Sequence, residues 1–326
     1  MNRMIVEKYM FIGCLCIIAL LSGCSEYDSV SPKSEPIYEP VRMPEKAMVM
    51  ADQSRNAIII SDLATNKVVW SWDPVSAKMP ASSQSWFVNP SECKPVMDNR
   101  CILMTASGGA VALIRIADHK VLFYAYCGSN PHSAEMLPDG NIVTAESYAG
   151  EINTFVVDTV KVFGVKADTK KIGNAHNVVW DAKRNCLYAT GTLQGGVTAV
   201  FRFSYNGDRL SPMLQGQKRI YTFENESGGH DLFPVQGKEG LLWLTAASAV
   251  YQLDVSKEPV SCEKVYDITD VKSIANDGND IYLLKSTEEW WAEGPVDPSG
   301  NAWFRLKGSR LYKCRLMQPD TFSYQQ

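Results

Sequence analysis

Short apolar runs separated by polar turn residues extend from about residue 47 to the end of the chain. The segment 130–158 shows the pattern, with the runs HSAEMLP, NIVTAES and INTFVVD and, between the first two, the turn residues Pro138, Asp139 and Gly140. Runs bounded by proline, aspartate or glycine are typical of β-strands joined by tight turns. Helical patterns are few. The distribution of apolar and polar positions therefore predicts an all-β fold.

The same order of strand-like runs recurs along the chain. The runs HNVVWDA, CLYATGT and VTAVFRFS form a second unit, and HDLFPV, LLWLTAA and AVYQLDV form a third. Other units begin with WFVNPSECKPV and KSIAND, and the unit that begins with AMVMADQ lacks its first strand. Recurrence at about forty to fifty residues indicates a β-propeller. We therefore expect a six-bladed β-propeller of four-stranded blades over residues 47–326. A β-sandwich, the alternative, would leave the recurrence unexplained.

The first unit needs a partner for its open edge, because an unpaired strand edge exposes backbone hydrogen-bonding groups. Either EPIYEPV, which precedes this unit, or the extreme C-terminus could supply the missing strand. The run SRLYKCRL is predicted to be an outer strand of the last unit.

Histidines occupy one position of the predicted repeat. His132, His176 and His230 each begin the first strand of consecutive units, whereas His119 lies in a turn between outer strands. The first strand of a propeller blade lines the central channel. We therefore expect the three imidazoles to converge at one end of the channel.

Three converging imidazoles suggest two kinds of chemistry. They could hold a divalent transition metal and leave coordination positions open for a substrate. Without a metal they could act as acid, base or nucleophile, or bind an anion. A third possibility is structural, because a repeated histidine could satisfy the backbone of each turn.

Neighbouring positions extend this predicted site. Ser91, Glu92 and Lys272 occupy equivalent places in flanking units and could contact a ligand. The last unit carries an insertion, STEEWWAEGPVDPSGNAWFRLKG, in which Glu288, Trp290 and Trp291 could form a wall beside the channel. Aromatic faces stack on sugar rings, and carboxylates bind hydroxyl groups. The insertion could instead cap the channel with its own apolar residues.

The N-terminal segment has the features of a bacterial lipoprotein signal. An apolar run after Arg3 and Lys8 ends in Leu21, Ser22, Gly23 and Cys24. We expect a signal peptide over residues 1–23, lipidation of Cys24 and a flexible tether over residues 24–46. An ordinary signal peptide or a helical anchor is the alternative. The predicted location is the cell envelope, lipid-anchored and at the outer membrane, with the periplasmic or surface side left open.

Charge and cysteine content limit the classes of partner, metal site and disulfide expected for this chain. The formal net charge is −4 and the basic residues are scattered, so no nucleic-acid partner is expected. We expect a monomer that meets the membrane only through its lipid. No cysteine pair has zinc-site spacing, and among the cysteines of the body only Cys93 and Cys101 flank a predicted hairpin where a disulfide could form.

Three segments carry resemblances to known families. The lipobox, VMADQSRNAIIISDLATNKVVWSWDP and NPHSAEMLPDGNIVTA resemble a family of uncharacterised envelope lipoproteins from Gram-negative gut-type bacteria, built as β-propellers. This resemblance covers essentially the whole mature chain and implies the fold and the location. HSAEMLPDGN is similar to a blade motif of bacterial arylsulfate sulfotransferases, propellers in which a channel histidine moves a sulfuryl group without metal. Pro131 stands where that motif has its first histidine. Oligogalacturonate lyases are an architectural parallel, in which histidines hold a metal that binds uronate.

These observations lead to three functional hypotheses. The first is metal-dependent binding or processing of an anionic oligosaccharide, through a lyase or hydrolase reaction, at His132, His176 and His230. The second is a non-catalytic scaffold that binds a glycan or a protein. The third is a sulfuryl-transfer enzyme.

Overall fold

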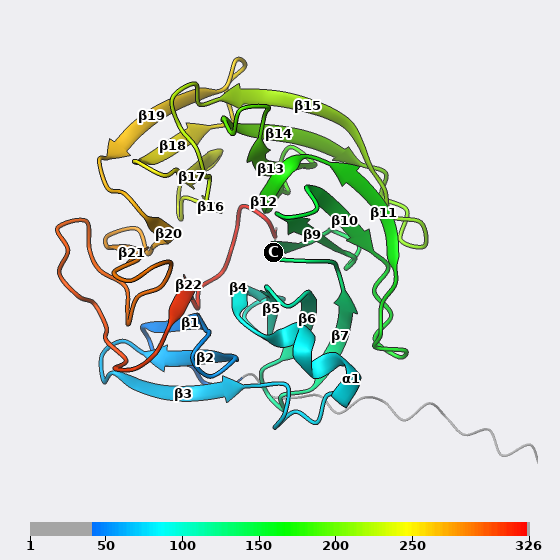
Figure 1. Cartoon of the computed structure of the whole chain (residues 1–326), viewed down its shortest axis with the longest axis vertical. Helices are drawn as coiled ribbons and strands as arrows, with labels where there is room; N and C mark the ends of the chain where they lie inside the picture. The colour runs from blue at the N-terminus through cyan, green and yellow to red at the C-terminus, as the bar shows by residue number, and fades with distance from the viewer. Residues whose placement is uncertain (1–40, 325–326) are drawn as a thin grey trace, which may run out of the picture. The chain divides into compact units, whose positions relative to one another are not determined.

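The computed structural model describes residues 41–324, in which antiparallel sheets follow one another around a central axis (Figure 1). Five of the sheets in this part of the chain have four strands, and we name them blades 1 to 5. From the innermost strand outward, blade 1 contains β22 (Leu311–Leu316), β1 (Ala47–Asp52), β2 (Ala57–Asp62) and β3 (Lys67–Trp72). Blade 2 contains β4 (Pro90–Val96), β5 (Cys101–Ala106), β6 (Ala110–Arg115) and β7 (Val121–Tyr126).

The remaining sheets continue around the axis. Blade 3 contains β8 (Pro131–Met136), β9 (Ile142–Glu146), β10 (Glu151–Phe155) and β11 (Lys166–Lys171). Blade 4 contains β12 (Gly173–Asp181), β13 (Cys186–Thr192), β14 (Thr198–Tyr205) and β15 (Leu214–Thr222). Blade 5 contains β16 (Asp231–Pro234), β17 (Leu241–Thr245), β18 (Val250–Asp254) and β19 (Ser261–Tyr266). A sheet of two strands, β20 (Val271–Asn276) and β21 (Ile281–Lys285), completes the ring, and we name it the short sheet.

The fold is thus an all-β propeller with four-stranded blades, but the predicted count of six such blades is wrong. Five blades have four strands, and the short sheet has two. After β21 the segment 286–310 forms turns and isolated bridges instead of two further strands. Pro295 and Pro298 cannot donate to a strand ladder. Gly294 lies so close to the Phe304 carbonyl that a Cβ would stand 1.8 Å from its oxygen.

The C-terminal strand closes the ring. β22 pairs antiparallel with β1, with Met48 opposite Leu316 and Asp52 opposite Leu311. It is therefore the innermost strand of blade 1, and the prediction that SRLYKCRL is an outer strand of the last unit is wrong. The missing strand of the first unit comes from the C-terminal part of the chain.

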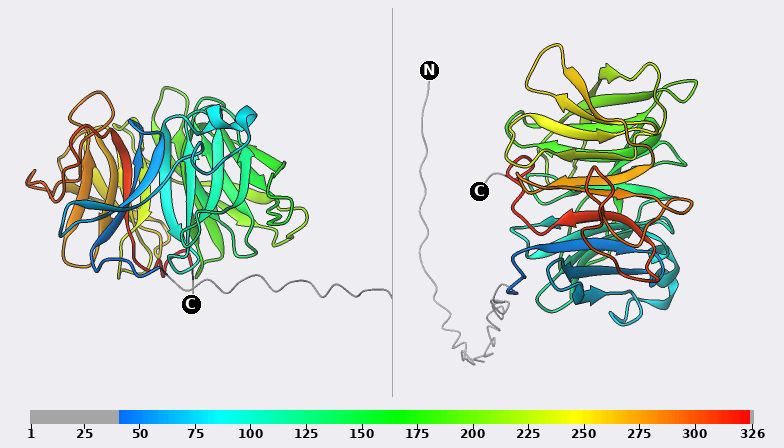
Figure 2. Two further views of the ribbon diagram at one scale, coloured as in Figure 1. Left: turned by 90° about the horizontal axis from the view of Figure 1, so that it is seen from below. Right: turned by 90° about the vertical axis from the view of Figure 1, so that its left-hand side faces the viewer.

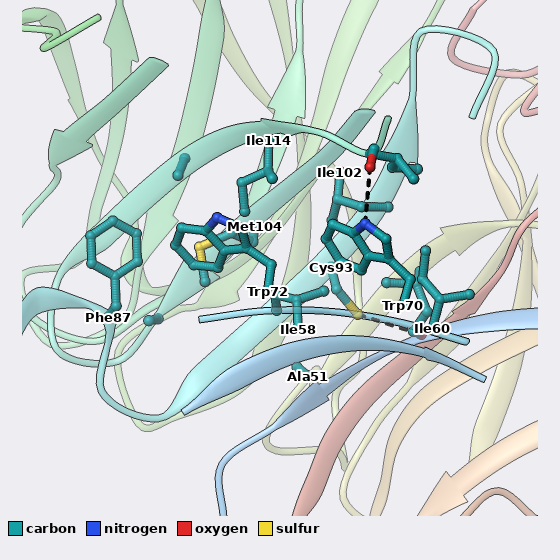
Figure 3. Close-up of a cluster of buried hydrophobic side chains, with 14 of the residues drawn as sticks. Ala51, Ile58, Ile60, Trp70, Trp72, Phe87, Cys93, Ile102, Met104 and Ile114 are labelled. Carbon is teal, nitrogen blue, oxygen red and sulfur yellow. Dashed lines mark hydrogen bonds between the residues drawn. The ribbon is translucent and has the colours of Figure 1, made fainter. Parts of the chain in front are cut away.

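Apolar side chains fill the space between neighbouring blades. Figure 3 shows the cluster between blades 1 and 2, where Trp72 and Phe87 meet side chains of β2, β5 and β6. The Trp70 indole N–H donates to the Ile116 carbonyl over 3.0 Å. A short helix α1 (Ala81–Gln84) and the helical turn η1 (Ser85–Phe87) link blade 1 to blade 2. Each large side chain buried here contributes about 1.5–3 kcal/mol to stability.

The inner strands all run in the same direction, which defines two ends of the channel. We name the end where they begin the histidine face and the other end the opposite face. The described chain enters at the opposite face, because Met317 N–H donates to the carbonyl of Ala47, the first residue of β1. Residues 317–324, the C-terminal plug, cross the same end, where Ala182 N–H donates to the Phe322 carbonyl (Figure 2).

Three further sequence predictions concern the N-terminal segment, attachment to a membrane and a possible disulfide. The predicted signal peptide, the lipidation at Cys24 and the tether as far as residue 40 lie outside the described residues. Within residues 41–324 no helix has the length and apolarity needed to cross a membrane. Cys93 and Cys101 are free, and Cys101 pairs with Val96 across the hairpin, so the possible disulfide is not formed.

Candidate functional site

The three predicted histidines lie side by side at the histidine face. His132 is the second residue of β8, His176 lies in β12, and His230 directly precedes β16. The ring centroids of His132 and His176 are 4.2 Å apart, and those of His176 and His230 are 5.4 Å apart. His132 is 8% exposed and His176 is 7% exposed. Rotation from one blade to the next therefore brings three distant histidines into one nearly closed cluster, which we name the imidazole cluster.

Burial keeps the imidazole cluster neutral. It lowers the pKa of His132 to about 3 and the pKa of His230 to about 4, and it lowers the pKa of His176 well below its ordinary value. The positive charge of Lys313 lowers all three pKa values further, and that of Lys272 lowers those of His176 and His230. At neutral pH each ring therefore carries one N–H donor and one unprotonated nitrogen.

Two further side chains lie beside the imidazole cluster at the histidine face, and we call this end of the channel the mouth. Lys272 Nζ lies 3.2 Å from His230 Nε2 and donates to it, because an ammonium group has no acceptor. Burial lowers the pKa of Lys272. Tyr312, from β22, meets His132 edge-on with ring centroids 5.6 Å apart, and its phenol is buried. The cluster thus gains one cation and one hydroxyl group.

Several ring nitrogens of the imidazole cluster have no protein partner. His132 Nδ1 donates to the Asn130 carbonyl over 2.8 Å, since a carbonyl can only accept. In contrast, both ring nitrogens of His176 and Nδ1 of His230 are buried with no hydrogen-bond partner among residues 41–324. A buried polar group without a partner costs about 1–3 kcal/mol. These nitrogens are therefore buried polar atoms that form no hydrogen bond to the described residues.

A fully buried charge network forms the floor beneath the rings. The Arg315 guanidinium binds Asp231 Oδ1 and Oδ2 over 2.7 Å each and Glu92 Oε2 over 3.1 Å. Lys313 Nζ lies 3.4 Å from a carboxylate oxygen of each acid. Burial opposes ionisation of Glu92, but Arg315 and Lys313 lower its pKa to about 2. Two carboxylates thus face two cations, and the floor carries no net charge.

Ser91 and Glu92 were predicted to contact a ligand, but their polar atoms form hydrogen bonds within the protein. Ser91 Oγ donates to the Pro131 carbonyl over 2.6 Å and lies 2.9 Å from Thr105 Oγ1. Glu92 belongs to the floor. Lys272, the third residue predicted at this level, is the one whose charged group joins the imidazole cluster.

The ligand set does not fit a divalent metal. Within residues 41–324 no group of three or more histidine, cysteine, aspartate or glutamate side chains is arranged to hold one. The Lys272 ammonium donates to His230 Nε2 and so occupies a lone pair that a metal would need. Its positive charge would also repel a cation.

Comparison with protein families gives one assignment. The family model that matches residues 6–326 is described as a family of unknown function (DUF6528). The chain belongs to the DUF6528 family. No curated protein sequence matches it.

Solved structures share the fold of this DUF6528 protein at low sequence identity. A chain of a nidogen/laminin complex matches with a TM-score of 0.57 and 12% identity, covering 83% of this chain and 98% of the other. A protein of unknown function from Bacteroides caccae matches with a TM-score of 0.53 and 14% identity, covering 84% and 99%. Hydrazine synthase of Kuenenia stuttgartiensis matches with a TM-score of 0.52 and 15% identity, covering 71% and 68%. Similarity at this level supports the fold alone.

The predicted tryptophan wall lies at the rim, outside the imidazole cluster. Trp290 is 45% exposed, and its indole N–H donates to Gln53 Oε1 over 2.9 Å. The Arg310 guanidinium lies 5.4 Å from the Trp291 ring centroid. The side chain of Glu288 is exposed. These residues belong to one loop at the edge of the histidine face, and no hydrogen bond or ring contact described for residues 41–324 joins them to an imidazole.

The sequence also misses three members of the site. Tyr312, Lys313 and Arg315 all come from β22 and supply the phenol and both cations of the floor. Their signal is the run YKCR, in which two basic residues alternate with a buried cysteine inside an apolar strand. Buried charges are rare unless they are paired, so this pattern points to a channel strand.

Proposed function

We propose that this DUF6528 protein binds a small anion, or the anionic group of a larger ligand, in the imidazole cluster. The observation that carries this proposal is the Lys272 ammonium, 3.2 Å from His230 and beside the unpartnered nitrogens of His176. The ion pairs described for residues 41–324 do not include Lys272, whose pKa is lowered by burial and raised by the negative charge of Asp270, two residues before it. Since the floor is internally neutral, this cation remains available to an anion.

The ligand class follows from the groups that face the mouth. Neutral imidazoles offer N–H donors, and the Tyr312 phenol adds an O–H donor. Lys272 supplies the positive charge, which the negative charge of Asp270 partly offsets. Carboxylate and sulfate monoester groups, each with one negative charge and several acceptor oxygens, match this arrangement. An anionic oligosaccharide, such as a uronate-containing or sulfated glycan, therefore remains the ligand class of the proposal, with the metal omitted.

The cellular setting of the proposal is a lipid-anchored protein of the cell envelope, as the lipobox indicates. The described chain enters blade 1 at the opposite face. Ala47, the first residue of β1, is therefore at the end of the channel opposite the imidazole cluster.

A titration tests the proposal. Galacturonate, sulfate and acetate are added to wild-type protein and to the Lys272→Met variant, and binding is followed by calorimetry and by imidazole NMR signals. The matched control is Lys183→Met, because Lys183 forms an exposed ion pair with Glu239. We expect Lys272→Met to weaken binding about tenfold or more and the control to leave it unchanged. Equal affinity in wild type and Lys272→Met contradicts the proposal. Stoichiometric binding of Zn²⁺ or Mn²⁺ would favour the metal hypothesis instead.

Sulfuryl transfer is a second candidate because of the orientation of His132. Its Nδ1 donates to Asn130, so Nε2 carries a free electron pair on a neutral ring. In this reaction Nε2 attacks the sulfur of an aryl sulfate, the bond from sulfur to the aryl oxygen breaks, and the phenolate takes a proton from water. The oxygen of an acceptor hydroxyl then attacks the sulfur, the bond from sulfur to Nε2 breaks, and the hydroxyl proton goes to the hydroxide left by that water. Phenol release that disappears in His132→Gln supports this candidate, and absence of turnover retires it.

A further inference from the structure

A pair of buried side chains beneath the imidazole cluster connects all three histidine segments. Lys313 Nζ donates to the His132 carbonyl over 3.1 Å and to Asn177 Oδ1 over 2.9 Å. Asn177 directly follows His176, and its Nδ2 donates to the Gly229 carbonyl over 2.9 Å. Gly229 directly precedes His230. We infer that the Asn177–Lys313 pair positions the three imidazoles relative to one another.

The hydrogen bonds of this pair can form in one orientation only. An ammonium group can only donate, so the atom of Asn177 that faces Lys313 is the carbonyl oxygen Oδ1. The amide nitrogen therefore faces Gly229 and Thr190, and it lies 3.1 Å from Thr190 Oγ1. Reversing the amide would break the bonds to Lys313 and to Gly229 together.

The segment that carries His230 depends on this bond. Gly228 and Gly229 both have φ of +90°, a conformation that side-chain-bearing residues rarely adopt. Two successive glycines give the chain freedom that must be restricted if His230 is to keep one position. The hydrogen bond from Asn177 to the Gly229 carbonyl provides this restriction, and the His230 N–H donates to the Thr245 carbonyl over 2.8 Å.

Lys313 itself is held by the floor. Its Nζ lies 3.4 Å from both Glu92 and Asp231, and Arg315 binds these two acids from the other side. All four side chains are 0% exposed. Lys313 is therefore fixed from below while it binds the His132 and Asn177 segments above. Asn177 and Lys313 are positioning residues, since they touch the backbone of the site and not the ligand.

Asn177→Asp tests the inference with little change of shape. The carboxylate still accepts from Lys313, but it cannot donate to the Gly229 carbonyl. We expect the ring NMR signals of His230 to shift, those of its neighbours to follow, and anion affinity to fall about tenfold. Asn177→Ala, which removes both bonds, serves as the second variant if the first fails to fold. Thr154→Val is the control, because Thr154 is also buried and its hydroxyl donates to the Pro212 carbonyl instead of to a histidine segment.

The ring NMR signals test the inference directly, whereas the anion affinity tests it only if the proposed function is correct. The two measurements therefore separate the inference from the proposed function, on which the affinity measurement rests. The chain has four histidines, so His119 in its exposed turn is an internal reference for the ring signals. Shifts confined to the imidazole cluster support the inference even if no anion binds wild-type protein, a result that would contradict the proposed function alone. Unchanged ring signals, or equal shifts at His119, overturn the inference even if anions bind.

Discussion

The buried histidines of the histidine face make the stability of the folded protein depend on pH. A histidine whose pKa is lower in the folded protein than in the unfolded chain binds fewer protons when folded, so acid favours unfolding. The unfolded value is about 6.5. Stability associated with the imidazole cluster is therefore complete above about pH 6.5 and is lost as the pH falls toward the folded values of about 4 for His230 and about 3 for His132.

Replacing His176 by phenylalanine isolates this effect. Burial raises the pKa of Glu146 to about 7, which favours folding on acidification, but this contribution is present in wild type and variant alike. As the pH falls below about 6.5, we expect the free energy of unfolding of wild type to fall relative to that of His176→Phe, with a slope that approaches the one-proton limit of about 1.4 kcal/mol per pH unit. Denaturant unfolding at several pH values measures the difference. His119→Asn is the control, and parallel curves for wild type and His176→Phe would show that the ring is not held neutral by burial.

The floor gives a second prediction at this scale. Removing Arg315 leaves Glu92 and Asp231 buried with only Lys313 between them. Loss of one partner from a buried charge network costs about 3–5 kcal/mol. We expect Arg315→Met to lower the free energy of unfolding by this amount, measured by denaturant unfolding. Lys183→Met breaks an exposed ion pair with Glu239 and is expected to cost less than about 1 kcal/mol. Similar losses in both variants would contradict the prediction.

The residues of the site differ in how far the sequence predicted them. His132, His176, His230 and Lys272 share one register of the repeat, and the regular direction of the inner strands brings them together. Tyr312 escaped prediction because β22 pairs with β1, which is more than 250 residues away in the chain, and local alternation cannot show such a partner. Metal binding was predicted from the presence of three histidines alone. The hydrogen bond from Lys272 to His230, which disfavours a metal, depends on side-chain geometry that the sequence does not show.

At the scale of elements, the segment 286–310 is where the repeat fails. The insertion predicted here is an ordered loop, in which Trp303 packs on Tyr282 and its indole N–H donates to the Ile281 carbonyl. Val296 forms an isolated bridge with Leu283. The further strand expected for the last unit, SRLYKCRL, is β22 of blade 1 instead, and the local sequence pattern cannot show which sheet a strand joins.

The Trp290 part of this segment distinguishes two of the functional hypotheses. Trp290 bonds Gln53, and Gln53 Nε2 in turn donates to the Pro90 carbonyl over 3.2 Å. Because Trp290 does not touch the imidazole cluster, we expect Trp290→Ala to change the affinity for galacturonate or sulfate less than twofold, by calorimetry. A scaffold that holds glycans on the rim would lose its binding in this variant. Loss in Trp290→Ala with retention in Lys272→Met would therefore favour the scaffold.

The whole molecule is held as a ring by the pairing of its N-terminal and C-terminal parts. β22 contributes Tyr312 to the mouth and Lys313 and Arg315 to the floor, so ring closure and site assembly depend on the same strand. The C-terminal plug has a separate role at the opposite face. Gln318 Nε2 donates to the Asn276 carbonyl over 2.8 Å, and the Tyr324 hydroxyl donates to Glu135.

Truncation after Met317 separates these two roles. The shortened chain keeps β22 and Met317 but loses the rest of the plug. This loss uncovers the Lys94–Glu135 ion pair at the opposite face. We expect a lower thermal unfolding midpoint, because Phe322 no longer packs between blades and several buried hydrogen bonds are lost. Anion affinity should stay within about twofold of wild type, because the floor lies between the plug and the imidazole cluster. Truncation before Leu311 removes the closing strand, and we expect this chain not to fold. If loss of the plug alone abolished anion binding in a protein that still melts cooperatively, the ligand would have to reach the channel from the opposite face.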